Sequence, residues 1–166
     1  MTTIAETLLP EFNDEMAATR RLLERVPESQ AAWKPHEKSR TLGDLAAHVA
    51  NIPRLMGVVI KREEMVAPDD SVRAPKFTTT AALLESFDKN VKEAREALNG
   101  VPDSRMSLPW TLKFGTQTIF SRPRSAVLRS FVMSHHIHHR GQLGVYMRMQ
   151  DVPLPKAYGP TADESF

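Results

Sequence analysis

The chain has 166 residues, 41% of them hydrophobic and 25% charged, with a formal net charge of +2. This length suits one domain with a core large enough to need no disulfide or metal staple, and the composition is ordinary for a globular protein. No apolar run approaches the roughly 18–20 residues that span a bilayer, so no membrane partner is expected. We therefore predict a single domain over residues 1–166.

The composition also disfavours a nucleic-acid-binding protein and a protein held by disulfides or thiolate ligands. Lys and Arg are spread among carboxylates along the chain, whereas nucleic-acid binders gather them into a patch or stripe. The chain has no cysteine, so disulfides and thiolate ligands are excluded, and any metal must be held by nitrogen and oxygen. The first six residues lack the basic start and apolar core of a signal peptide, and a cytoplasmic location is expected.

The first half of the chain predicts two helices. Apolar residues at steps of three and four indicate an amphipathic helix from Thr3 to Arg25, followed by a connection over residues 27–40. A second helix begins at Thr41, which with Asp44 resembles a capping box. Its apolar seam continues to Val59, but Pro53 within it predicts either a kink or a break.

The second half predicts two more helices. Residues 62–78 show no periodicity and indicate a loop, and a helix then runs from threonines 78–80 to the stop signal at residues 99–100. The β-branched and aromatic stretch 108–120 allows a short hairpin. The last helix is predicted from Pro123 to Gln150. These elements indicate an all-α domain with a short hairpin before the last helix.

Four of the six histidines lie at positions 135, 136, 138 and 139. On a helix, residues four apart are neighbours on one face, so His135 and His139 are predicted to share the centre of the apolar stripe. His138 falls on its flank, and His136 is predicted to point outward. The pair His135 and His139 can therefore converge on one point.

A divalent metal would explain such a pair. A buried imidazole needs partners for both ring nitrogens, and neighbouring buried imidazoles are destabilised if either becomes charged. His48, on the apolar face of the second helix, is the predicted third ligand, whereas His36 lies in a connection and is expected to be exposed. No Glu separates the pair, which disfavours a zinc peptidase. Three imidazoles leave open positions, as in catalytic sites.

Other interpretations stay open for these residues. A single histidine such as His48 on a core face is more often a hydrogen-bonded core residue, and the 135–139 cluster could be partly exposed or line a dimer interface. Asp44 either orients His48 or only caps its helix. Gln142 and Tyr146 either line a pocket or pack within the helices.

Two glycines also require a reason. Gly141 and Gly144 each cost about 1 kcal/mol relative to alanine inside a helix. The usual reason is the close approach of another helix, and that is the prediction for this segment. Trp33 in the first connection is predicted to anchor that connection by packing its indole against the helices.

Three segments together resemble a known family: Leu42–His48, then His135–Leu143 with its His-Arg-Gly-Gln-Leu block, then Tyr158–Glu164. They resemble the DinB-like family of metalloenzymes over nearly the whole chain. The resemblance implies a four-helix bundle of up-down-down-up order with a long crossover, commonly a homodimer. It also implies a divalent metal, nickel or zinc, held by His48, His135 and His139. Ser134 departs from the Asn or Asp that relatives often carry, and His136 is an uncommon extra imidazole.

The resemblance also suggests chemistry. The wider superfamily includes S-transferases and isomerases that use low-molecular-weight thiols such as bacillithiol or mycothiol. We expect a metal-dependent enzyme that activates a thiol or water for attack on a small electrophile, and without cysteine the thiol must come from a cofactor. The alternatives are a metal-dependent hydrolase and a non-catalytic, metal-binding stress-response dimer. The sequence identifies no general base and no residue that binds substrate or thiol.

Overall fold

The computed structural model describes residues 2–165. Within this range, no helix is both long enough and apolar enough to cross a membrane. The principal elements in chain order are α1 (Ile4–Leu23), α2 (Leu42–Asn51), α3 (Arg54–Lys61), β1 (Glu64–Ala67), α4 (Thr80–Leu98), α5 (Asp103–Ser107), β2 (Pro109–Phe114), β3 (Gln117–Pro123), α6 (Arg124–Val127), η3 (Leu128–Ser134) and α7 (His135–Arg148). Short 3-10 turns, η1 (Glu28–Gln30) and η2 (Asp70–Val72), lie in the connections.

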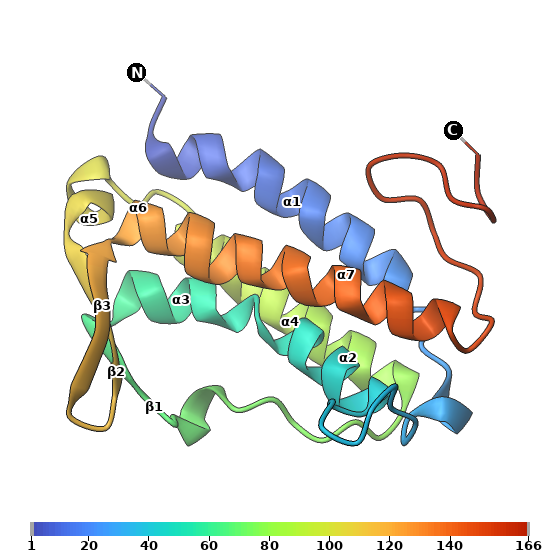
Figure 1. The fold of residues 1–166 in the computed structure, drawn as a ribbon. Helices are drawn as coiled ribbons and strands as arrows, with labels where there is room; N and C mark the ends of the chain where they lie inside the picture. The colour runs from blue at the N-terminus through green and yellow to red at the C-terminus, as the bar shows by residue number, and fades with distance from the viewer. Residues whose placement is uncertain (1, 166) are drawn as a thin grey trace.

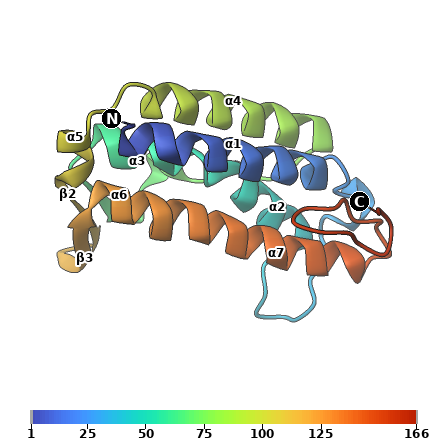
Figure 2. The same ribbon diagram turned by 90° about the horizontal axis from the view of Figure 1, so that it is seen from above.

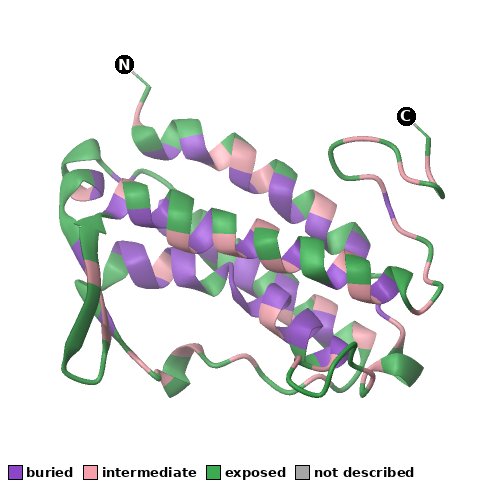
Figure 3. Cartoon of the chain, in the orientation of Figure 1, coloured by how far each residue is buried: buried purple, intermediate pink, exposed green. Residues whose placement is uncertain are grey.

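The long helices pack side by side, and the sheet covers one end of them (Figures 1 and 2). Their inward faces form one apolar core, whereas the hairpin and much of the C-terminal tail are exposed (Figure 3). Phe12, Met56 and Phe87 are at most 1% exposed. The regular spacing of such residues along each helix therefore buries one continuous apolar stripe per helix.

Threonine hydroxyls cap three of the long helices at their starts. Thr3 Oγ1 accepts from the Glu6 backbone N–H at 3.2 Å, Thr41 Oγ1 from Asp44 at 3.1 Å and Thr79 Oγ1 from Ala82 at 3.1 Å. These bonds satisfy N–H groups that have no partner within the first helical turn. The predicted start of the second helix at Thr41 is confirmed.

Pro53 breaks the second helix. α2 ends at Asn51 and α3 begins at Arg54, because proline has no N–H to donate and its ring crowds the preceding turn. Of the two predicted outcomes, a kink or a break, the structure shows the break. His48 therefore lies in the last turn of α2, next to a change in chain direction.

The predicted all-α class and four-helix bundle are wrong, because the chain also forms a three-stranded mixed sheet. The short hairpin allowed by residues 108–120 is present as antiparallel β2 and β3, with Gly115 at a φ of +54° in its turn. The unexpected strand is β1, which pairs in parallel with β2. β1 has only four residues, and its pairing partner lies far along the chain. No local sequence pattern therefore predicts this strand.

The predicted last helix is one continuous helix whose type changes along its length. α6 passes into η3, which is π-helical, and η3 passes into α7. π-Helical turns are rare and are common at functional sites. Here the π segment ends at Ser134, directly before His135, so α-helical phase cannot be extrapolated through residues 128–134.

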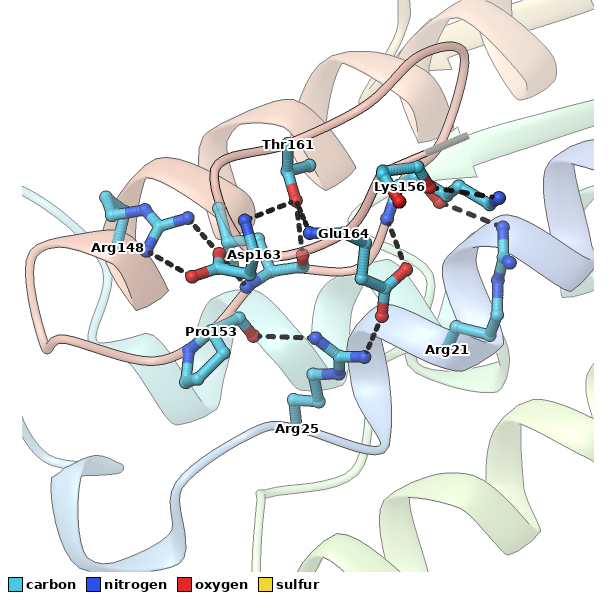
Figure 4. A network of polar contacts seen from close by, with 10 residues as sticks. Arg21, Arg25, Arg148, Pro153, Lys156, Thr161, Asp163 and Glu164 are labelled. Atoms are coloured by element: carbon cyan, nitrogen blue, oxygen red, sulfur yellow. Dashed lines mark hydrogen bonds and ion pairs between the residues drawn. The ribbon is translucent and has the colours of Figure 1, made fainter.

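The C-terminal tail is bound to α1 and α7 by polar contacts (Figure 4). Asp163 accepts from Arg148 and from the Leu154 backbone N–H, and Glu164 pairs with Arg25. Thr161 Oγ1 donates to the Leu154 carbonyl at 2.9 Å and so closes the tail into a loop. The Thr161–Glu164 end of the family-like motif therefore holds the tail in place.

Arg124 connects the sheet to the start of the last helix. Its side chain is fully buried, and it donates to the carbonyls of Val59, Pro109 and Arg62 at 2.9 Å each. It also pairs with the exposed carboxylate of Glu63 at 2.8 Å. One guanidinium thus joins the end of α3, the approach to β1 and the first residue of β2.

We expect Arg124→Met to lower the free energy of unfolding by about 3 kcal/mol or more, because three carbonyls lose their donor. Arg122→Met is the matched control, since Arg122 is exposed and its guanidinium lies over the Phe120 ring, 5.3 Å from the ring centroid. The control should lose less than about 1 kcal/mol. Urea unfolding followed by circular dichroism measures both, and equal losses would contradict this account.

Candidate metal centre

His48, His135 and His139 converge across the packed helices. Each offers one ring nitrogen, and these atoms lie within 4.8 Å of one another. His48 Nε2 and His135 Nε2 are 3.2 Å apart, and the His139 ring lies 4.6 Å from that of His48 and 4.7 Å from that of His135. The three residues predicted as ligands are therefore brought together from α2 and α7.

This arrangement fits a divalent ion. Two nitrogens bound at about 2.0–2.1 Å in tetrahedral geometry would lie about 3.3 Å apart, close to the separation of His48 Nε2 and His135 Nε2. His135 Nδ1 is buried without a hydrogen bond of normal geometry. The Phe131 backbone carbonyl, one turn earlier, opposes the lowering of the His135 pKa by burial. The donor set is nitrogen alone, which suits zinc or a transition metal better than calcium or magnesium.

Gln142 orients the third imidazole. Its Oε1 lies 2.7 Å from His139 Nδ1, so that nitrogen carries the proton and Nε2 keeps its lone pair for a metal. Tyr146, one turn further, instead packs edge-on against Trp33 with ring centroids 5.7 Å apart. The sequence left open whether Gln142 and Tyr146 line a pocket or pack within the helices. Gln142 contacts His139 of the candidate site, and Tyr146 packs beside it. The predicted anchoring role of Trp33 is confirmed.

The three imidazoles are held neutral. Burial and then the charge of Arg40 lower the pKa of His48 to about 3. Burial and the neighbouring His139 lower the pKa of His135 to about 4, and burial also lowers that of His139. Burial disfavours the charged form of an imidazole, and a neutral imidazole is the form that binds a metal.

A cavity of about 460 Å³ opens beside His48 and His135, within the size range of small-molecule sites. Its apolar wall includes Leu55 and Phe131, and the Phe131 ring stacks on His135 at 5.8 Å between centroids. Asp44 also lines it. In the described part of the chain the Asp44 carboxylate makes no hydrogen bond to His48, so its observed role is at the start of α2 and on the cavity wall.

The outward orientation predicted for His136 is wrong. His136 is 1% exposed because α7 packs against α1 as well as α2, so the helix has a second inward face. Its Nε2 lies 2.8 Å from Thr19 Oγ1, whose own proton is donated to the Glu15 carbonyl. His136 Nε2 therefore donates to Thr19. His138 and His36 are exposed, as expected for His36.

The same face of α7 carries a buried ion pair that sequence reasoning missed. Arg140 lies 2.7 Å from the Glu15 carboxylate and donates to the Tyr158 hydroxyl at 2.6 Å. That hydroxyl donates to the Glu15 carboxylate at 2.9 Å. The network links α1, α7 and the tail, and it uses Arg140 and Tyr158, both of which belong to the family-like segments. Their position in those segments was the signal in the sequence that could have pointed to the network.

The predicted close approach of another helix to Gly141 and Gly144 is not found. A Cβ built at either position meets no atom of the described chain within 4 Å. Both glycines instead line a second cavity of about 380 Å³ beneath the C-terminal tail. Their small size therefore leaves open space beside the tail.

The DinB family profile matches residues 1–165. Protein YrdA of Bacillus subtilis (strain 168) is 23% identical over 159 residues, covering 94% of this chain and 89% of YrdA. A DinB-like crystal structure from Bacillus cereus ATCC 10987 aligns with a TM-score of 0.72 at 23% identity, over 95% of this chain and 99% of that one. The B. subtilis DinB-like protein YjoA aligns with a TM-score of 0.68 at 21% identity, over 91% and 96% of the two chains.

These matches span nearly the whole chain, and the segments that align with the family include the three converging histidines and the tail motif. The structural neighbours, at under 25% identity, share the fold. The family is therefore shown by the sequence match over residues 1–165, and the chain belongs to the DinB family.

Proposed function

We propose that this chain binds a divalent metal, nickel or zinc, through His48, His135 and His139, and that it is a metal-dependent enzyme acting on a small molecule. The observation that carries the proposal is the convergence of three neutral imidazoles at the edge of a cavity. A metal held there would lower the pKa of a bound thiol or water and so supply a nucleophile at neutral pH.

The residues of the chain have separate parts in this proposal. With a metal bound, His48 and His135 would offer the lone pairs of their Nε2 atoms, which lie 3.2 Å apart. Gln142 holds His139 in the tautomer that leaves Nε2 without a proton. The apolar wall around Phe131 excludes water from one side of these nitrogens. The cavity holds the second reactant, an electrophile, beside the activated group.

The favoured reaction is transfer of a low-molecular-weight thiol to an electrophile, and hydrolysis is the second candidate. The chain has no cysteine, so a thiol nucleophile would come from outside. Turnover of an electrophile that rises only when a thiol is added supports transfer, and turnover in water alone supports hydrolysis. A non-catalytic, metal-binding homodimer would show neither, and sedimentation reports the dimer independently.

Single substitutions test the ligand set. We expect His48→Ala, His135→Ala and His139→Ala each to lose stoichiometric metal, because two imidazoles cannot hold the ion tightly. Gln142→Ala should keep metal but bind it about 10–100-fold more weakly, since it only orients His139. His36→Ala is the control and should match the parent. Elemental analysis of untagged protein measures the metal content of all five variants, and a zinc titration measures the affinity of Gln142→Ala. Full metal in His48→Ala would refute the assignment.

The depressed pKa values predict an unusual pH dependence. Three imidazoles with an ordinary pKa of about 6.5 would lose roughly 600-fold in metal affinity between pH 7 and pH 5.5, because protons compete for each nitrogen. Here His48 and His135 stay neutral to about pH 3–4, so little proton competition arises in that window. We expect a loss under about tenfold.

Calorimetric titration with zinc at the two pH values, corrected for buffer binding, provides the measurement. A loss of several hundredfold would show that the imidazoles titrate normally and that burial does not hold them neutral. Metal release on further acidification should begin only as the pH approaches these lowered pKa values.

A further inference from the structure

The cavity beside the histidines has a charged rim as well as an apolar wall. Three cations line it, Arg40, Arg73 and Lys76, and two carboxylates, Asp44 and Asp69. The charges do not simply cancel within the cavity, because some of these groups are already paired with residues beyond it. The pairing decides which charges remain available to a ligand.

Two of the five charged groups are engaged elsewhere. Asp69 pairs with Arg62 at 2.8 Å and accepts from the Ser71 backbone N–H at 2.9 Å. Arg73 pairs with Asp70 at 2.9 Å. Among the described residues, neither Arg40 nor Lys76 has an ion-pair partner within 4.0 Å. The remaining rim therefore holds two cations and Asp44, a surplus of one positive charge.

Arg40 lines the cavity together with His48 and His135. Burial is the main cause of the lowered pKa of His48, His135 and His139, and the charge of Arg40 adds to it in each case. A fixed positive charge at that place repels a divalent cation and so weakens metal binding. Such a placement is explained if Arg40 pairs with an anionic group of the bound molecule.

Resting on the proposed metal site, we infer that the cavity takes a small organic acid whose carboxylate pairs with Arg40 and Lys76 and whose apolar body lies against Leu55 and Phe131. One carboxylate matches the surplus of one positive charge. The planar guanidinium of arginine suits a carboxylate in particular, since it can donate two parallel hydrogen bonds. The volume of about 460 Å³ admits a molecule with an aromatic ring.

A pair of aromatic thiols tests the inference on the cobalt-loaded chain. 4-Mercaptobenzoate and 4-mercaptobenzamide differ in the charge of one group, and binding of either thiolate to Co²⁺ gives a charge-transfer band that can be titrated. We expect the unsubstituted chain to bind the carboxylate at least about tenfold more tightly, the effect of one hydrogen bond to a charged group.

Substitutions locate the preference. Arg40→Gln should remove most of the tenfold preference, because the affinity for the benzoate falls more than the affinity for the benzamide, and it should bind cobalt at least as tightly as the parent. Lys38→Gln is the matched control: it removes the same charge from the same connection, but Lys38 does not line the cavity. It should keep the preference.

The outcomes separate the two proposals. If the parent binds cobalt and then binds the two thiols with equal affinity, the inference is overturned and the metal site stands. A preference that survives Arg40→Gln would overturn the role of this cation. Failure of the parent to bind cobalt would overturn the metal site, and the inference with it. Loss of the preference in Arg40→Gln, with the preference kept in Lys38→Gln, would support the inference.

Discussion

The position of the last helix between α1 and α2 governs the rest of the structure. A helix with one neighbour buries one stripe, but α7 contacts both α1 and α2 and so has two inward faces. One face carries His135 and His139 toward His48. The other carries His136 and Arg140 toward α1. The site and its support are thus built on one rigid element.

Burial sets the chemistry on both faces. Removing an imidazole from water disfavours its charged form. His48 and His135 are therefore neutral. On the other face burial, followed by the charge of Arg140, lowers the pKa of His136 to about 3. The buried Arg140 is balanced by Glu15 at 2.7 Å, as a charge that leaves water must be. The same desolvation therefore keeps the imidazoles neutral on one side and requires an ion pair on the other.

The tail completes that second face. Tyr158 is 70% exposed, yet its hydroxyl reaches both Arg140 and Glu15. Asp163 binds Arg148 of α7, and Glu164 binds Arg25, which lies two residues past the end of α1 (Figure 4). The motif near the C-terminus thus acts at a distance from the cavity beside His48 and His135, since it fixes the helix from which His135 and His139 project.

The sequence by itself determined the long helices, their threonine caps, the ligand candidates and the family, because these depend on local periodicity, capping chemistry and side-chain spacing. Only the tertiary structure decided between a kink and a break at Pro53, the parallel pairing of β1 with β2, and the burial of His136. Each of these depends on a partner far along the chain. Periodicity within α7 correctly placed His135 and His139 on one face, but it could not show that a second helix covers the neighbouring face.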